Sequence, residues 1–128
     1  MKLAGMLFMI IVLLSACRAA ECTLVAPVRI TSAQALEMMA AGDVVILDVR
    51  TPQEFAQGHI EGAVLIPVDE IETLAPTLLP DKGQTLLVYC RSGARSHQAA
   101  LILINLGFTS VYDFGGILDF LQISYEPS

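Results

Sequence analysis

The sequence predicts an α/β domain with a central, mainly parallel five-stranded sheet and helices on both faces. Short apolar runs alternate with helix-start signals, as in folds whose parallel strands are joined by helices. One run, residues 44–49, is almost continuously apolar, which is typical of a strand buried on both faces. Neither an internal repeat nor a low-complexity segment interrupts this pattern.

The first helix of the domain follows a short candidate strand at residues 28–30. Thr31 has the side chain of an N-cap, and Gln34, three residues later, completes a capping box. Gly42 is suited to end this helix. The apolar run at residues 44–49 then predicts the second strand.

A second capping box begins the next helix. Thr51 and Glu54 have the required spacing, and Pro52 occupies the first helical position, where its missing N–H is not needed. Gly58 predicts that this helix is short. Residues 63–66 then form an apolar run that predicts the third strand.

The fourth strand leads directly to a cysteine. Residues 68–79 are expected to be helical in part, with an interruption at Pro76. The apolar run at 86–89 then ends at Cys90, and a helix is expected over residues 95–106. That helix is apolar nearly all round, so we expect it to be well buried.

The end of the domain has a helix cap and one more strand. Gly107 followed by Phe108 predicts a left-handed C-terminal cap with a hydrophobic contact. Residues 111–114 predict the last strand, and the glycine pair at 115–116 leads to a short helix through Phe120.

The N-terminus predicts export. Lys2 precedes an uncharged, apolar stretch at residues 3–14, and small residues follow, so residues 1–16 have the three parts of a signal peptide. The stretch is shorter than the roughly 20 residues of a membrane-spanning helix, although an uncleaved anchor is the alternative. Residues 14–17, Leu-Ser-Ala-Cys, resemble the lipobox of bacterial lipoproteins. This predicts lipidation of Cys17, with ordinary cleavage after Ala19 or Ala20 as the competing outcome.

These boundaries define the expected organisation. Residues 1–16 are the signal peptide, 17–27 a tether and 28–128 one domain, long enough to bury a core. We therefore expect an exported, periplasmic protein, anchored to a membrane if Cys17 is acylated.

The charge balance restricts the partners. The chain has seven basic and 13 acidic residues, a net charge of −6, and no basic stripe that would indicate nucleic-acid binding. An anionic substrate would therefore need a local positive site.

The cysteines do not indicate a disulfide framework or a metal site. Cys17 and Cys22 lie near the N-terminus, Cys90 lies deep in the domain, and none has metal-ligand spacing. Cys22 can be read either as an idle tail thiol or as a thiol that reacts with Cys90.

Cys90 has the surroundings of a reactive thiol. It lies between a buried strand and a helix start, where parallel α/β sheets place their sites and where backbone amides favour an anion. A loop of small residues can turn several amides inward. Arg91 and Arg95 add positive charge, so we expect the thiol to ionise more readily than a free cysteine. The alternative, a buried core cysteine, does not explain the two arginines.

Three motifs in order resemble the rhodanese (thiosulfate sulfurtransferase) family. Residues 90–96, Cys-Arg-Ser-Gly-Ala-Arg-Ser, resemble the active-site loop of the family. Residues 47–63 resemble its upstream signature and residues 115–117 its downstream one. The similarity spans about residues 28–120, and the exported single-domain form also resembles the periplasmic phage-shock type. Phe120 departs from the tryptophan common in the family.

The resemblance implies a rhodanese-like fold and two-step transfer of a sulfane sulfur through a Cys90 persulfide, without a metal or organic cofactor. It further implies an anionic donor such as thiosulfate and a thiol or cyanide acceptor. Four residues separate Cys90 from Arg95, one fewer than in related phosphatases, which favours sulfur over phosphate. The loop residues expected to bind the donor are Arg91, Ser92, Gly93, Ala94, Arg95 and Ser96.

Three charged residues upstream are expected to support the structure. Asp48, Arg50 and Glu54 have a spacing that lets them pair around a helix start.

Two alternatives to a thiosulfate-using enzyme remain. One is a persulfide carrier that docks a partner and turns over small donors poorly. The other is an inactive scaffold, which usually lacks the cysteine.

Overall fold

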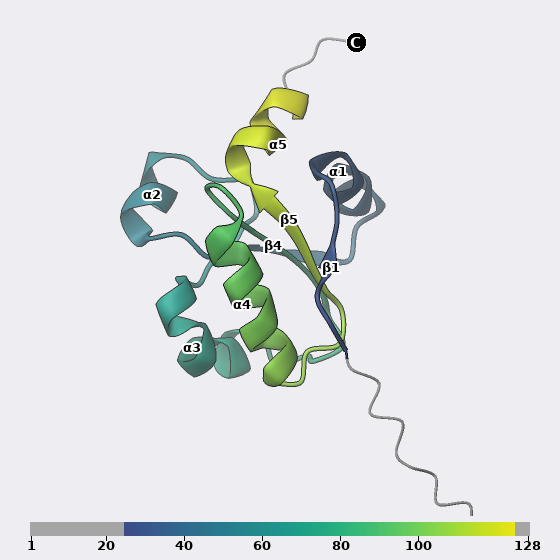
Figure 1. Ribbon diagram of the computed structural model, residues 1–128, viewed down its shortest axis with the longest axis vertical. Helices are drawn as coiled ribbons and strands as arrows, with labels where there is room; N and C mark the ends of the chain where they lie inside the picture. The colour runs from purple at the N-terminus through teal and green to yellow at the C-terminus, as the bar shows by residue number, and fades with distance from the viewer. Residues whose placement is uncertain (1–24, 125–128) are drawn as a thin grey trace, which may run out of the picture.

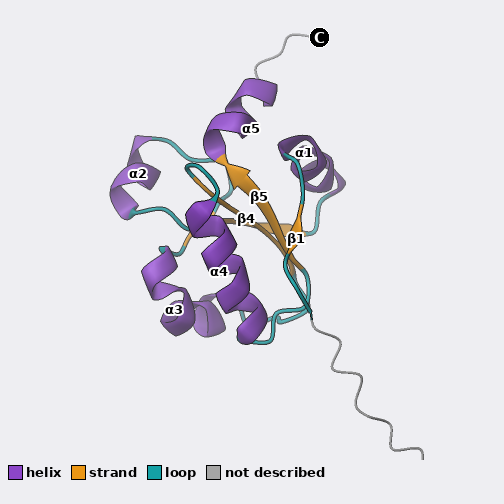
Figure 2. Ribbon diagram, viewed as in Figure 1, coloured by secondary structure: helices purple, strands orange, loops and turns teal. Residues whose placement is uncertain are grey.

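The computed structural model describes residues 25–124 of the chain. Five strands form one sheet in the order β1-β5-β4-β2-β3, and every pairing between neighbours is parallel (Figures 1 and 2). The predicted α/β class and the five-stranded sheet with helices on both faces are thus confirmed. The strands are β1 (Val28–Arg29), β2 (Val44–Asp48), β3 (Val64–Leu65), β4 (Thr85–Cys90) and β5 (Val111–Gly116).

The helices divide between the two faces of the sheet. The helical elements are α1 (Ser32–Ala41), α2 (Pro52–Gln57), the 3-10 helix η1 (Val68–Glu70), α3 (Ile71–Leu78), α4 (Ala94–Asn105) and α5 (Ile117–Ser124). Helices α3 and α4 cover one face, and α1 and α5 pack together on the other (Figure 1). Two hydrophobic cores result, one on each side of the sheet.

Strand β4 contributes to both cores because successive side chains of a strand point to opposite faces. Leu86, Val88 and Cys90 belong to the core under α3 and α4. Leu87 and Tyr89 belong to the core under α1 and α5. The central strand is therefore buried on both faces.

Local capping signals behave as predicted. Thr31 and Gln34 form a capping box at α1, and Thr51 and Glu54 form one at α2 with Pro52 in the first turn. At the end of α4, Gly107 has a φ of 98°, and the amide of Phe108 donates to Leu103 O at 3.1 Å. These features confirm the predicted left-handed cap.

Two helices differ from expectation. The helix expected to be interrupted at Pro76 continues through it, with Pro76 inside α3 and the amide of Leu79 donating to Ala75 O at 2.8 Å. Pro76 and Glu72 are both exposed, so solvent can bond the Glu72 carbonyl that the proline leaves without its helical donor. The last helix extends beyond Phe120 to Ser124.

Candidate active site

The candidate site lies at the carboxyl edge of the sheet, where β4 and β5 end side by side. Cys90 is the last residue of β4, and its partner in the register is Gly116, the last residue of β5. Ligands of open α/β sheets bind at this edge. In Figure 1 the edge is the one bordered by α2, the loop before α4 and the start of α5.

The Cys90 sulfur meets a backbone amide at the start of α4. The N–H of Gly93 donates to Cys90 Sγ over 2.9 Å. Gly93 is the N-cap of α4 and has a φ of 106°, a conformation that other residues adopt only with strain. Cys90 itself is fully buried. The loop therefore folds over the sulfur and presents to it the positive end of a helix.

Gly116 permits the loop to lie against the end of β5. A Cβ atom at this position would lie 2.4 Å from the carbonyl oxygen of Arg91, which is backbone and cannot move aside. Only glycine fits this close approach. Gly116, the second glycine of the downstream motif, thus has a steric reason to end β5.

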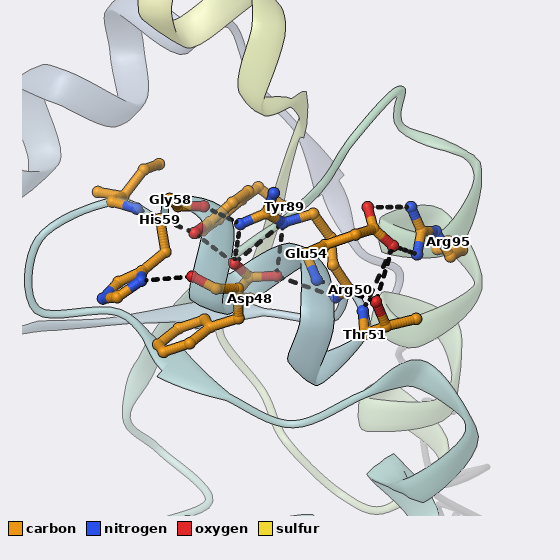
Figure 3. A network of polar contacts seen from close by, with 10 residues as sticks. Asp48, Arg50, Thr51, Glu54, Gly58, His59, Tyr89 and Arg95 are labelled. Atoms are coloured by element: carbon orange, nitrogen blue, oxygen red, sulfur yellow. Dashed lines mark hydrogen bonds and ion pairs between the residues drawn. The ribbon is translucent and has the colours of Figure 1, made fainter.

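Arg95 and Glu54 form an ion pair beside the loop. Arg95 Nη1 and Nη2 donate to the two carboxylate oxygens at 2.7 and 3.0 Å (Figure 3). Hydrogen bonding to Arg95 is the main cause that lowers the pKa of Glu54 to about 2, and the same pairing raises the pKa of Arg95. Because Glu54 also caps α2 through Thr51, this pair connects α2 to the Cys90 loop.

The rest of the loop divides into exposed and buried positions. Arg91, Ser92 and Ala94 are exposed, whereas Gly93 and Ser96 are buried. Within residues 25–124, the Arg91 guanidinium makes neither an ion pair nor a hydrogen bond. Of the two loop arginines, Arg91 is therefore the one whose charge is not engaged.

Asp48, the last residue of β2, and Arg50, two residues later, support the site. Both are buried, and Arg50 Nη2 donates to Asp48 Oδ2 at 2.7 Å and to Gly58 O at 2.7 Å. The hydroxyl of Tyr89 donates to Asp48 Oδ2 at 2.6 Å and accepts the amide of Ile60 at 3.1 Å (Figure 3). Burial, followed by the bond to Asp48, raises the pKa of Tyr89, and the bond to Asp48 raises that of Arg50.

The three upstream charged residues take different partners. The first two pair with each other, but Glu54 pairs with Arg95, 41 residues later. Spacing along the chain cannot reveal this contact, because it forms only when the fold brings α2 next to the loop.

Asp113 is a residue of the site that was not predicted from the sequence. This buried residue of β5 accepts the Ser96 hydroxyl at 2.7 Å and the Gly115 amide at 2.9 Å on Oδ1. Its Oδ2 has no hydrogen bond to any of the described residues 25–124, and Arg29 Nη1 and His97 Nδ1 each lie 4.0 Å away. Ser96 Oγ also lies 3.0 Å from Gly93 O. Asp113 thus holds the first turn of α4 and the end of β5. An acidic residue inside an otherwise apolar strand is the feature of the sequence that could have revealed it.

The family model of the rhodanese-like domain matches residues 31–122. The chain belongs to the rhodanese family.

Cys17, the residue predicted to carry a lipid, lies outside the described residues. In residues 25–124, no three His, Cys, Asp or Glu side chains are grouped so that they could hold a metal ion.

Relatives of this chain include sulfurtransferases and larger proteins. It is 42% identical over 73 residues to the thiosulfate sulfurtransferase PspE of Escherichia coli, with 57% of this chain and 70% of PspE covered. A sulfurtransferase of Allochromatium vinosum is 40% identical over 77 residues, or 59% and 70% of the two chains. A tRNA uridine(34) hydroxylase of Photorhabdus laumondii is 29% identical over 98 residues. The match covers 73% of this chain and 28% of that protein. The sulfurtransferase relatives support a transferase.

Solved structures agree with the assignment to the rhodanese family. A rhodanese with anions from E. coli has a TM-score of 0.56 at 41% identity, covering 59% of this chain and 88% of that one. The human single-domain sulfurtransferase TSTD1 has a TM-score of 0.69 at 27% identity, covering 80% and 99%. The second match extends over nearly the whole of a single-domain protein.

Because of the Glu54–Arg95 pair, we expect the free energy of unfolding to depend on pH. A carboxyl whose pKa is lowered from 4.5 to about 2 stabilises the fold above about pH 4.5 and loses this effect as the pH falls toward 2. We expect Glu54→Gln to lower the free energy of unfolding at pH 7 by about 1–2 kcal/mol, since solvent screens the partly exposed pair. Urea denaturation should show this difference shrinking between pH 4.5 and 2. Glu37→Gln, which removes an exposed carboxylate of α1, is the control, and a pH-independent difference for Glu54→Gln would contradict the prediction.

Proposed function

We propose that this rhodanese moves a sulfane sulfur from an anionic donor such as thiosulfate to a thiol or cyanide acceptor through a persulfide on Cys90. The observation that carries the proposal is the contact between Cys90 Sγ and the Gly93 amide at the start of α4. That amide and the helix end stabilise negative charge on sulfur, whether on a thiolate or on a persulfide. The similarity to PspE supports thiosulfate as the donor.

The reaction has two displacement steps. The Cys90 thiolate attacks the outer sulfur of thiosulfate, the S–S bond of the donor breaks, and sulfite leaves with the electron pair of that bond. A thiolate or cyanide then attacks the outer sulfur of the Cys90 persulfide. The new bond gives an acceptor persulfide or thiocyanate, and the electron pair returns to Cys90 as a thiolate. No net oxidation of the protein occurs.

The loop arginines are proposed to hold the donor, together with the residues from Ser92 to Ser96. Arg91 offers an exposed guanidinium without an ion pair, so a dianion can bind it without displacing a protein carboxylate. Arg95 has less charge to offer a donor, because its two terminal nitrogens already donate to the Glu54 carboxylate. Arg91 should therefore be the more effective donor ligand.

A second candidate function is that of a persulfide carrier with little turnover of small donors. The tRNA hydroxylase relatives favour it, because there the matching segment is a minor part of a longer protein. A steady-state assay that compares thiosulfate and several thiols with protein acceptors separates the two functions.

We further propose that the protein is exported to the periplasm and anchored to a membrane through Cys17. In this organisation residues 1–16 form the signal peptide, 17–27 the tether and 28–128 the domain. Among residues 25–124, no helix is long and apolar enough to cross a membrane.

Processing can be checked on the intact protein. We expect protein made in a bacterial host to begin at Cys17 and to carry a diacylglyceryl group on its sulfur, because residues 14–17 have the lipobox pattern. Mass spectrometry measures the start and the lipid together, and Cys17→Ala serves as the unlipidated control. A mature start at Ala20 or Glu21 without lipid would keep export and contradict the anchor.

The persulfide is tested by substitution of Cys90. Cys90→Ser should abolish thiosulfate-to-cyanide transfer, since a hydroxyl cannot form a persulfide, while the nearly isosteric change preserves the fold. Wild-type protein treated with thiosulfate should gain the mass of one sulfur, and peptide mapping should place it on Cys90. Transfer at the wild-type rate in Cys90→Ser, or the extra sulfur on another residue, would contradict the mechanism.

The donor site is tested by removing one charge at a time. Arg91→Ala should lower kcat/KM for thiosulfate by about tenfold to a hundredfold, because a charge-assisted hydrogen bond contributes about 1.5–3 kcal/mol. Arg95→Ala should also lower it, but by less, because Arg95 is already paired with Glu54. A monoanionic donor should lose less. Lys82→Gln removes the same charge beside Leu106 O, at the far end of α4, and is the control. Equal losses for all donors, or in the control, would show that the arginines do not bind the dianion.

A further inference from the structure

A pocket with a volume of about 380 Å³ opens beside the Cys90 loop. One wall is Ile117, Leu118 and Leu121 of α5, and the other comes from α2 and the residues after it, including Gln57 and His59. Arg91, which directly follows Cys90, also lines the pocket. The pocket therefore extends from the loop along the first turn of α5.

The apolar wall is not explained by the packing of the domain. Ile117 and Phe120 of α5 are buried in the core shared with α1. Leu118 and Leu121 project on another side of the helix and are 53% and 41% exposed. The solvent side of such a helix is ordinarily polar, so these leucines form a second apolar face. Being three residues apart, they are neighbours on the helix surface and line the pocket together.

The polar groups of the pocket determine the kind of ligand that fits. Arg50 is engaged by Asp48 and Gly58 O, and Glu54 is engaged by Arg95. Among the Arg and Glu side chains that line the pocket, Arg91 is the one that has no ion pair with another of the residues 25–124. The pocket thus offers a cation next to the reactive residue and an apolar surface that leads away from it.

We propose that this pocket binds the sulfur acceptor, and that the acceptor is a thiol with a carboxylate close to its sulfur and an apolar chain. The carboxylate pairs with Arg91, which brings the thiol next to Cys90, and the chain lies against Leu118 and Leu121. This proposal rests on the proposed function. The Arg91 guanidinium acts in both steps. It becomes free when sulfite leaves, and it then binds the carboxylate of the acceptor.

The chemical step is the second displacement. The acceptor thiolate attacks the outer sulfur of the Cys90 persulfide, a new S–S bond forms on the acceptor, and the old one breaks to return the thiolate of Cys90. Charge and sulfur are conserved, and no oxidant is required.

The experiment uses a series of 2-mercaptoalkanoates from 2-mercaptopropionate to 2-mercaptooctanoate, with thiosulfate as the donor. For the wild type, kcat/KM should rise about two- to fourfold for each methylene added, as apolar surface is buried. The gain should level off once the chain spans the single turn between Ile117 and Leu121, about 5.4 Å. A value that does not change with chain length would overturn the proposal.

Variants locate the effect. Leu118→Ser and Leu121→Ser should flatten the dependence on chain length, whereas Leu101→Ser, which changes a 45% exposed leucine of α4, should retain it. Arg91→Gln should reduce the advantage of a 2-mercaptoalkanoate over the neutral 2-mercaptoalkanol of the same length. Equal slopes in all three leucine variants would place the chain elsewhere and overturn the proposal.

Two measurements separate this proposal from the proposed function. Thiosulfate-to-cyanide transfer by the wild type tests the proposed function without the pocket. Binding of octanoate, which has no thiol, tests the pocket without transfer. It should shift the NMR signals of the Leu118 and Leu121 methyl groups, and the binding should be weaker in Arg91→Gln. Transfer to cyanide without octanoate binding overturns the pocket alone. Octanoate binding without transfer supports the pocket and contradicts the proposed function.

Discussion

The arrangement at the carboxyl edge depends on the buried carboxylate of Asp48. It accepts hydrogen bonds from the backbone and side chain of Arg50 and from the Tyr89 hydroxyl, so strands β2 and β4 share one anion. Through Arg50 it reaches Gly58 O, and through Tyr89 it reaches the Ile60 amide. A buried charge is costly unless it is fully paired, and here the pairing fixes the segment that follows α2. That segment forms one side of the candidate site.

A second anion, Asp113, acts on the other side of the Cys90 loop. Asp48 fixes the polypeptide after α2, whereas Asp113 fixes the first turn of α4 through Ser96 and the end of β5 through Gly115. Cys90 lies between these two supports at the end of β4, and the loop after it is held by Glu54 through Arg95 and by Asp113 through Ser96. The only loop residue with a long, charged side chain and no ion pair in the described part of the chain is Arg91, which suits a group that must exchange one anion for another.

Most of the fold could be predicted because its signals are local. A capping box such as Thr31 with Gln34 depends on residues three apart, and the cap at Gly107 depends on one glycine and the phenylalanine after it. The apolar strand before Cys90 and the arginines after it likewise indicated a reactive thiol. The contacts that could not be predicted join distant residues: Glu54 with Arg95, and Asp113 with Ser96. Pro76 was misleading because an exposed helix end tolerates the missing hydrogen bond.

The parallel direction of all five strands also sets how the domain can be presented. Strand β1 runs alongside β5 in the same direction, so Val28 lies toward the amino edge and Cys90 lies at the carboxyl edge. The chain therefore enters the sheet at the end remote from the sulfur. A surface that held the protein by the segment before β1 would leave the Cys90 edge turned outward, toward molecules arriving from the surrounding solution.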